Sequence, residues 1–479
     1  MHDVTTVAAV RSRAVHGRIT EALVAVEVIL SGVLCAWQIG RHSMWLDEAV
    51  TAGLAHAPTN DFLKQVTGRE ISSVLYFTLV RAVSTVAGHG EASLRALSAL
   101  AVAATVVPVY LLGRDLASPR TGLTASLLWA VSPRAVQLGQ EARGFALETF
   151  LLALSAVVLL RAFRTGRRAA WAWWSALTLL AGLCHLLSTF VSVSLLTPLL
   201  LAGIRARWRP ALLAVTTALA PLAALAAVGR TRGAGHLSFL TGLPLRQVVG
   251  LPGNLSYDSV AVAALLCVAC VAALVGVGRH WAVASSPERA ELLLPVVWLV
   301  LPVVGASAYS LVVQPVFTPR YLVTVLPAFI LLASLGLREL GSRRGLIAAA
   351  VVAAVSLAVV PRVWSAHDVQ AWRPALASVL ERAQPGDAAV TVPSYDVSAY
   401  VYAASRARRR GVPTPLTLPA EPVPDPTQAL AGASRVWTVA TVDGSGDTRS
   451  AALLRELQGW HVVDERRFGS LTVKLLTRP

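Results

Sequence analysis

The sequence predicts a polytopic all-α membrane protein with about eleven transmembrane helices and a small soluble α/β domain at its C-terminus. Three observations predict it. Of the 479 residues, 55% are hydrophobic and 14% charged, with a mean hydropathy of +0.62, whereas soluble domains have about 25% charged residues. The apolar residues form runs long enough to cross a bilayer. After Pro361 these runs end and polar residues return.

Each apolar run has about 17–20 residues, as a hydrocarbon core of about 30 Å requires. The predicted spans are 21–39, 92–112, 121–138, 145–162, 171–186, 188–203, 211–228, 259–278, 292–311, 321–338 and 345–361. The run 171–203 is divided at His185, because only a hairpin keeps the later loops in phase. Residues 71–87 are interpreted as an interfacial helix, since a further span would place Asp47 and the C-terminus on opposite sides of the membrane.

The formal net charge of +16 comes mainly from arginines in short loops between the spans. This is the positive-inside pattern of a membrane protein and does not indicate a nucleic-acid partner. The arginines on the predicted cytoplasmic side, besides those of the N-terminus, are Arg114, Arg120, Arg161–Arg168, Arg205, Arg207, Arg209, Arg279, Arg289, Arg338, Arg343 and Arg344. The predicted protein is a multi-pass cell-membrane protein with a cytoplasmic N-terminus, and its C-terminal region lies outside.

Two domains are predicted, a transmembrane domain over 1–361 and an extracytoplasmic α/β domain over 362–479. The second domain combines short apolar strand patterns with helical ones and a Pro-rich loop. Its predicted strands are 388–392, 436–440 and 471–476, its helices 397–408 and 448–457, and its Pro-rich loop 413–426. It carries no acid, base or metal-ligand constellation, so we interpret it as accessory.

The loop 40–91 contains the most informative residues, Trp45-Leu46-Asp47-Glu48, directly after the first span. Carboxylates are costly close to a bilayer, so an adjacent pair there indicates a site. The alternative is that both acids merely favour the N-terminus of a short loop helix.

Further motifs follow in a fixed order along the chain. They are Ser43–Ala49, Gly88–Ser98, Tyr110–Arg114, Gln140-Glu141-Ala142-Arg143-Gly144-Phe145, His185 and Pro319-Arg320-Tyr321. Together they resemble the GT-C glycosyltransferases that use polyprenyl-phosphate sugars, especially the family 39/83 relatives of bacterial protein O-mannosyltransferases and aminoarabinose transferases. The resemblance is strongest over 40–165. The C-terminal domain resembles extra domains of some actinobacterial members.

The resemblance implies inverting transfer of mannose or arabinose from a polyprenyl monophosphate to a glycan, lipid or protein acceptor of the cell envelope, on the outer face of the membrane. It implies no nucleotide and no cofactor. Many members carry His-Pro-Pro-Leu-Tyr in the first loop, where this chain has Glu70-Ile-Ser-Ser-Val-Leu-Tyr76. No role is therefore carried over for the missing histidine.

The chemistry of such a transfer requires a base for the acceptor hydroxyl and cationic donors for the phosphate leaving group. Asp47 meets the first requirement, and the resemblance implies that it is the base. Glu48 either orients the acceptor or Asp47, or is a solvated neighbour.

Arg143 is the first candidate for the donor phosphate, because its forked guanidinium suits phosphate oxygens. Arg320 is the second, with Tyr321 beside it as a hydrogen-bonding partner. Interfacial snorkelling is the alternative for both arginines, and a place in the aromatic belt is the alternative for Tyr321. Lys64 and Arg69 are weaker candidates, because cations in loops are usually solvated.

Glu141, His185 and Tyr76 are assigned to substrate binding. Glu141 with Asp47 could hold a divalent cation, but these are too few ligands, and pairing with Arg143 is the preferred alternative. No metal site is therefore predicted. His185 either contacts sugar or phosphate or is satisfied by a hydrogen bond between helices.

Other function classes remain open. A transporter or flippase of a lipid-linked glycan predicts two matching halves with interrupted helices, which the sequence does not show. An envelope glycan polymerase or ligase on another membrane fold would not require Asp47-Glu48 after the first span.

Overall fold

The computed structural model describes residues 2–68, 71–201, 208–232, 245–365, 370–407, 412–417, 425–441 and 448–479. Arg69, Arg205, Arg207, residues 202–203 of one predicted span and 418–424 of the Pro-rich loop lie outside these ranges. The chain divides into two compact units. The first comprises 1–37, 59–83 and 95–364, and the second 38–58, 84–94 and 365–479.

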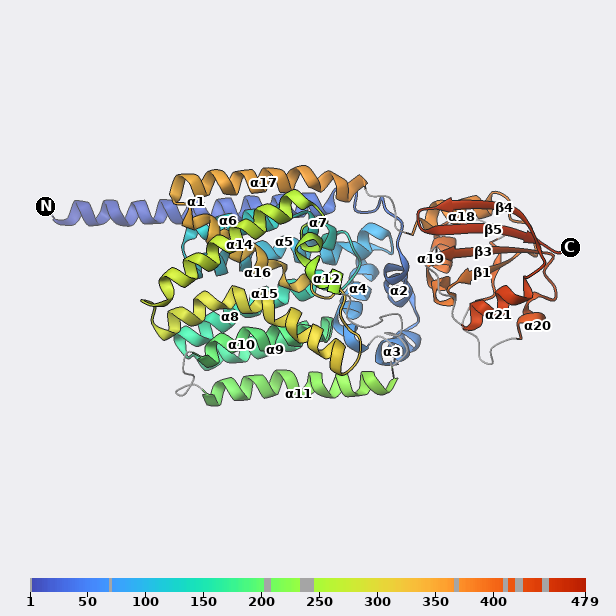
Figure 1. Ribbon diagram of the computed structural model, residues 1–479, viewed down its shortest axis with the longest axis horizontal. Coiled ribbons are helices and arrows are strands. Elements are labelled where there is room, and N and C mark those ends of the chain that lie inside the picture. Colours follow the sequence, from blue (N-terminus) through green and yellow to red (C-terminus); the bar gives the residue numbers. More distant parts are fainter. Residues whose placement is uncertain are drawn as a thin grey trace. The chain divides into compact units, whose positions relative to one another are not determined.

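The first unit is a bundle of helices, and a helix lies in every predicted span (Figure 1). Its helices are α1 (His2–Ala36), α3 (Thr59–Gly68), α4 (Val74–Ala87), α5 (Glu91–Leu116), α6 (Pro119–Ala130), α7 (Pro133–Gly139), α8 (Phe145–Thr165), α9 (Arg168–Cys184), α10 (Ser188–Leu201), α11 (Trp208–Arg232), α12 (Leu245–Val249), α13 (Leu251–Leu255), α14 (Val260–Trp281), α15 (Ser286–Val312), α16 (Leu326–Glu339) and α17 (Ser342–Ser365). In the described ranges, seven helices are long and apolar enough to cross a membrane, namely α1, α5, α8, α11, α14, α15 and α17. The predicted class of a polytopic helical membrane protein is confirmed.

The predicted span 121–138 differs from the structure, because it consists of two helices, α6 and α7. Pro133 cannot donate the backbone hydrogen bond that would continue α6. Ser132 instead caps a new helix, its hydroxyl accepting from the Ala135 N–H at 3.4 Å. The break brings the end of α7 into a turn before α8.

The division of 171–203 is confirmed, because α9 ends at Cys184 and α10 begins at Ser188, on either side of His185. Residues 71–87 are helical as predicted, with a single 3-10 turn, η1 (Ile71–Ser73), before the 14-residue α4. The place of α4 at the membrane interface stays a prediction.

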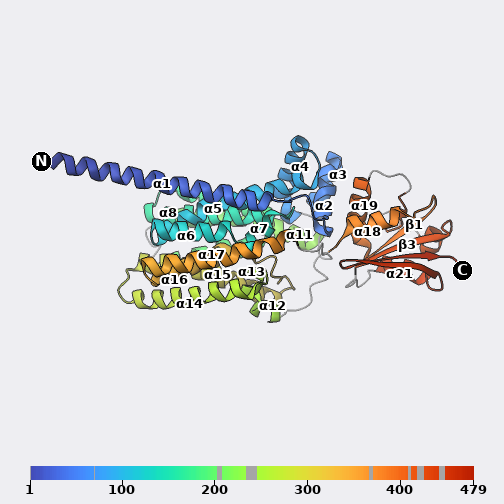
Figure 2. The ribbon, with the colours of Figure 1, turned by 90° about the horizontal axis from the view of Figure 1, so that it is seen from above.

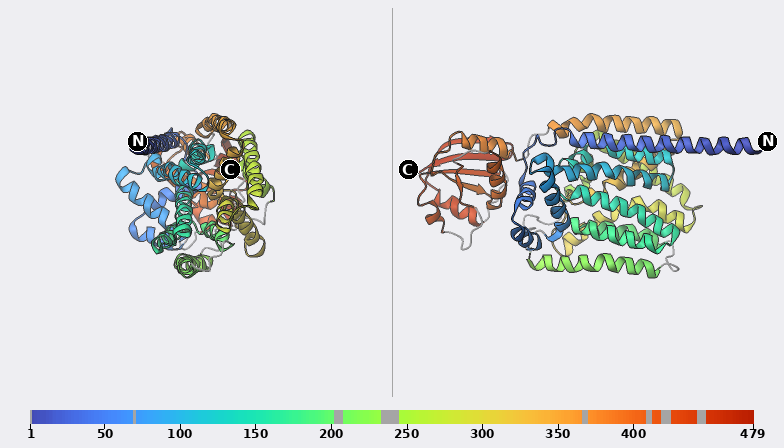
Figure 3. Two further views of the ribbon diagram at one scale, coloured as in Figure 1. Left: turned by 90° about the vertical axis from the view of Figure 1, so that its left-hand side faces the viewer. Right: turned by 180° about the vertical axis from the view of Figure 1, so that it is seen from behind.

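The helices of the first unit pack through small residues, as membrane helices do without a hydrophobic force between them. Pairs in contact include α8 with α9, α14 with α16 and α10 with α15. A Cβ at Gly336 would lie 1.7 Å from the carbonyl oxygen of Ala269, so only glycine allows α16 to approach α14 there. Figures 2 and 3 show these long helices running alongside one another.

The second unit contains an α/β fold with a five-stranded sheet of order β2-β1-β3-β5-β4. Its elements are α2 (Leu46–His56), α18 (Trp372–Leu380), β1 (Ala388–Val392), the 3-10 turn η4 (Ser394–Asp396), α19 (Val397–Ala407), β2 (Thr414–Pro415), α20 (Pro426–Leu430), β3 (Arg435–Thr441), α21 (Thr448–Glu456), β4 (His461–Phe468) and β5 (Leu471–Thr477). The strands β2, β1 and β3 are parallel, and β5 is antiparallel to β3 and β4.

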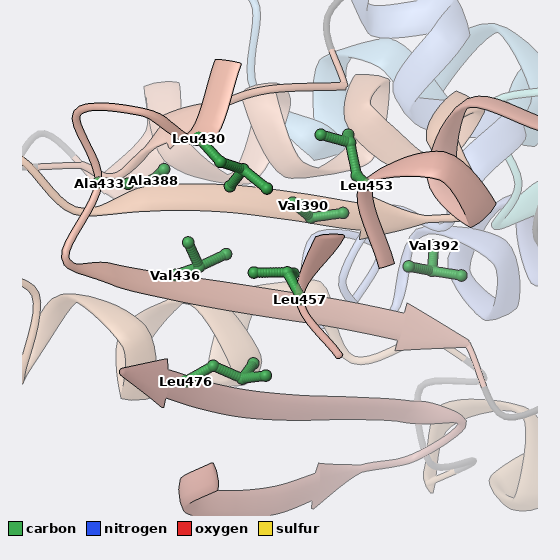
Figure 4. Packing of buried hydrophobic residues seen from close by; sticks show 9 residues of the cluster. All are labelled: Ala388, Val390, Val392, Leu430, Ala433, Val436, Leu453, Leu457 and Leu476. Atoms are coloured by element: carbon green, nitrogen blue, oxygen red, sulfur yellow. The ribbon is translucent and has the colours of Figure 1, made fainter. Parts of the chain in front are cut away.

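The predicted strands and helices of this domain are confirmed at β1, β3, β5, α19 and α21. The strand β4 was not predicted, because it is an edge strand whose side chains are mostly exposed and polar. Both faces of the sheet are buried, since Trp437 and Val473 on one face are at most 1% exposed. On the other face, leucines of α20 and α21 cover β1 and β3 in a core cluster (Figure 4). Val390 and Val436 are fully buried at its centre, as expected of strands in a parallel sheet.

A buried acid follows β1. Asp396 in η4 is 1% exposed, and neither carboxylate oxygen has a hydrogen-bond partner among the residues that the structure describes. Burial raises the pKa of this carboxyl from 3.8 to about 7, so the folded domain favours the neutral acid.

Asp396→Asn should therefore stabilise the domain increasingly as pH rises. The pKa of Asp396 in the folded chain lies above its value in the unfolded chain. The contribution of this carboxyl to the free energy of unfolding is therefore complete below about pH 4 and is lost as pH rises through about 7. The resulting difference in the free energy of unfolding between Asp396→Asn and the wild type is at most about 4 kcal/mol at pH 8. Urea-dependent hydrogen exchange of β1 in the full chain, at pH 5 and pH 8, measures it. An equal effect at both pH values would contradict the assignment.

Candidate active site

The turn between α7 and α8 carries Glu141 and Arg143 and is fixed from two sides. The Gln140 side-chain amide donates to the carbonyls of Cys35 (3.2 Å) and Trp37 (2.7 Å) at the end of α1. The Ser98 hydroxyl donates to the Arg143 carbonyl at 3.2 Å. These bonds satisfy carbonyls that a helix end leaves unpaired, and they hold the turn rigidly.

A second turn carries Arg320 and Tyr321 and follows α15. The hydroxyl of Ser310 accepts from the backbone N–H groups of Val316 (3.0 Å) and Phe317 (2.9 Å). The Tyr321 N–H donates to the Thr318 carbonyl at 3.0 Å. The Pro-Arg-Tyr motif is therefore presented by an ordered turn before α16.

These two turns meet at a polar pocket of about 410 Å³ in the first unit. Its lining residues are Arg134, Gln137, Leu138, Glu141, Gln247, Asn254, Thr318, Pro319 and Arg320. The Arg134 guanidinium donates to Gln137 Oε1 at 2.6 Å, and Gln137 Nε2 donates to Glu141 Oε1 at 3.0 Å. The pocket therefore combines two guanidinium groups with one carboxylate.

Arg134 is not among the site residues predicted from the sequence. The sequence pattern could have indicated Arg134, because it is a cation inside the predicted span 121–138. Charged residues within membrane spans usually line functional cavities. Counting the run as a plain span concealed it. Arg320 and Glu141 line the same pocket, and their roles toward a substrate stay predictions.

A second cluster adjoins the same turns. The His185 ring lies 4.8 Å from the Tyr321 ring and 5.4 Å from the Phe145 ring, between ring centroids. The Arg143 guanidinium lies 6.0 Å from the Phe145 ring centre. Arg320 and Tyr321 are consecutive, so the pocket and the aromatic cluster share one turn of the chain.

Glu148 lies beneath this cluster and was also missed. It is fully buried in α8, and its Oε1 is 3.9 Å from His185 Nδ1, beyond hydrogen-bond length. His185 Nδ1 is buried without a hydrogen-bond partner in the described part of the chain, which does not support a helix-to-helix bond through that nitrogen. The signal was again a charge inside a predicted span, 145–162.

Asp47 and Glu48 lie in the second unit, in the first turn of α2. Acids are favourable there, as the alternative interpretation expects, but the N-cap is Trp45 and no side chain of that residue caps the helix. Asp47 is half-buried, whereas Glu48 is 1% exposed. Glu48 is therefore not the solvated neighbour that one interpretation allowed.

The remaining candidates have ordinary surroundings. Lys64 is exposed on α3, which favours the solvated interpretation. Tyr76 is fully buried, with its hydroxyl 3.1 Å from Ser98 Oγ, and its contact with substrate stays a prediction. Across the described residues, no group of three or more His, Cys, Asp or Glu side chains is arranged to hold a metal ion.

Comparison with solved structures identifies the fold. ArnT from Cupriavidus metallidurans in the apo state aligns with a TM-score of 0.57 and 14% identity, over 96% of this chain and 98% of that one. The chain has the GT-C glycosyltransferase fold. Two other GT-C structures support it. The same ArnT bound to undecaprenyl phosphate gives a TM-score of 0.56 at 12% identity, over 95% and 97% of the two chains.

The oligosaccharyltransferase AglB from Archaeoglobus fulgidus, in complex with an inhibitory peptide and a dolichol-phosphate, gives a TM-score of 0.50 at 12% identity, over 95% of this chain and 74% of that one. Residues 72–229 of this chain match the family model described as dolichyl-phosphate-mannose-protein mannosyltransferase. That range includes the α7–α8 turn and His185. A comparison with curated protein sequences finds no match.

Proposed function

We propose that the protein is a membrane glycosyltransferase that transfers one sugar from a polyprenyl monophosphate to an acceptor outside the cytoplasm. The observation that carries the proposal is the pocket lined by Arg134, Arg320 and Glu141 in a chain with the GT-C fold. Arg143 lies in the same turn as Glu141. Guanidinium groups suit a phosphate leaving group, since their charge and forked donors match its oxygens.

In this proposal Asp47 is the general base. It takes the proton of the acceptor hydroxyl as that oxygen bonds to the anomeric carbon of the sugar. The bond from that carbon to the phosphate oxygen breaks at the same time, and polyprenyl phosphate leaves with the bonding pair. Arg143 and Arg320, with Arg134, stabilise the charge that builds on the phosphate, and the configuration at the anomeric carbon is inverted.

The sugar is proposed to be mannose or arabinose and the acceptor a glycan, lipid or protein of the cell envelope. The name of the matching family model supports mannose and a protein acceptor. The undecaprenyl phosphate and dolichol-phosphate bound to the related structures support the polyprenyl carrier.

The purified chain in sealed lipid vesicles tests the proposal. Polyprenyl-phosphate mannose and polyprenyl-phosphate arabinose, each labelled in the sugar, are supplied with envelope extract as acceptor. We expect labelled product and released polyprenyl phosphate with one of the two donors, and none with the matching nucleotide sugar. Product from the nucleotide sugar alone, or movement of the lipid donor across the bilayer without product, would refute the transferase and favour another class.

The orientation gives a separate prediction. The arginine-rich loops predict a cytoplasmic N-terminus and an external C-terminal domain. In a chain lacking its native cysteines, Cys at the exposed Glu456 should react with a membrane-impermeant maleimide in intact cells. Cys at the exposed Arg167 should react only after permeabilisation. The opposite pattern would place Asp47 in the cytoplasm and contradict an external reaction.

A further inference from the structure

The first residues of the C-terminal domain bind the loop that leads into α2, within the second unit. Gln370 Oε1 accepts from the Leu46 N–H at 2.9 Å. That N–H belongs to the first residue of α2, where helix donors lack intrahelical partners, and the N-cap Trp45 supplies no side-chain acceptor. Gln370 therefore caps α2 from 324 residues away.

Arg373 binds the same loop along its length. Its guanidinium donates to the carbonyls of Arg41 (3.1 Å) and Gly40 (3.4 Å) and forms an ion pair with Glu91. Its backbone N–H donates to Ser43 Oγ at 3.3 Å. Four residues of the segment 40–46, just before Asp47, thus form hydrogen bonds with Gln370 and Arg373 of the C-terminal domain.

These two side chains are attached to a rigid support. Trp372 between them is 2% exposed, and its indole N–H donates to Gln370 Oε1 at 3.2 Å, which fixes the amide. The helix α18, which begins at Trp372, packs on β4, β5 and α19, and α19 packs on α2. The His56 ring at the other end of α2 lies 4.0 Å from the His89 ring.

We propose that Gln370 and Arg373 are positioning residues for Asp47, so that the C-terminal domain sets the orientation of the general base. The inference rests on the proposed role of Asp47. A base must be held close to one geometry to act on the acceptor hydroxyl, and displacement of about 1 Å can cost about 100-fold in rate. The domain is then part of the catalytic apparatus and not an accessory.

The first test measures the contact without using activity. Hydrogen exchange at the amides of Leu46 and the first turn of α2 is compared in the wild type, Gln370→Ala and Gln370→Glu. Loss of a helix cap should accelerate exchange roughly fivefold in Gln370→Ala, whereas Gln370→Glu keeps the acceptor oxygen and should exchange like the wild type. Arg382→Ala, which removes an ion pair with Asp464 in the same domain, is the matched control and should not change exchange in α2.

The second test uses the kinetics of sugar transfer. Gln370→Ala and Arg373→Ala should each lower kcat about tenfold, with an unchanged KM for the polyprenyl-phosphate donor, because they displace the base and leave the phosphate site intact. Gln370→Glu should restore kcat, and Arg373→Lys should restore it in part. Arg382→Ala should keep the wild-type kcat.

Asp47→Asn separates the two proposals. If Asp47→Asn is inactive while Gln370→Ala leaves both exchange and kcat unchanged, the positioning role is overturned and the proposed function stands. If exchange accelerates but kcat does not fall, the contact exists and the positioning role is again overturned. If Asp47→Asn keeps the wild-type turnover, the proposed role of Asp47 as the base fails, and the positioning of that base fails with it.

Discussion

Asp47→Asn should reduce turnover by about 10²–10⁴-fold, the loss typical of a missing general base. Asparagine keeps the size of the side chain but cannot accept the acceptor proton. Binding of the lipid donor should change little, since the base acts on the other substrate. Initial rates of sugar transfer at saturating donor, with donor binding measured separately, check both parts.

Asp61→Asn provides the matched control for this variant. Asp61 is an exposed acid in the first turn of α3, another short helix of the segment 40–91, so the substitution makes the same charge change. It should leave turnover unchanged. Turnover near the wild-type value in Asp47→Asn, with folding verified, would remove Asp47 from the mechanism.

Arg143→Ala should have the second largest effect, a decrease of about 10- to 100-fold in kcat/KM for the polyprenyl-phosphate donor. Hydrogen bonds to charged groups contribute about 1.5–3 kcal/mol each. Arg143→Lys should lose less, because lysine keeps the charge but not the forked geometry. Arg320→Ala should behave like Arg143→Ala, since Arg320 lines the pocket.

Arg167→Ala is the control for the arginine variants, because Arg167 is an exposed residue between α8 and α9, in a loop assigned to the cytoplasmic side. The assay varies donor concentration at fixed acceptor. If Arg143→Ala and Arg143→Lys both show wild-type dependence on donor, Arg143 is an interfacial residue that snorkels to lipid headgroups and has no role at the phosphate.

The fold could be predicted closely because it rests on the length and order of apolar runs. Even the break at His185 followed from the requirement that later loops stay in phase, and α9 and α10 flank it. The strand β4 could not be predicted, because its exposed polar side chains lack the alternation that marks a half-buried strand.

The site could be predicted only in part. Arg143, Arg320 and Glu141 lie in loops, where a charge is visible against an apolar chain. Arg134 and Glu148 lie inside apolar runs, which were interpreted as helix alone. The bond between Gln370 and Leu46 spans 324 residues, and no local pattern in a single sequence reports a contact of that range.

The two edge strands of the C-terminal sheet have a consequence when many copies of the protein share one membrane. One edge strand is the two-residue β2, and the other is β4. In β4, Asp464 forms an ion pair with Arg466, and Glu465 forms one with Lys474 of β5. Short or charged edge strands oppose the addition of a strand from another molecule. Neighbouring copies can therefore crowd a patch of membrane without joining their sheets into a continuous polymer.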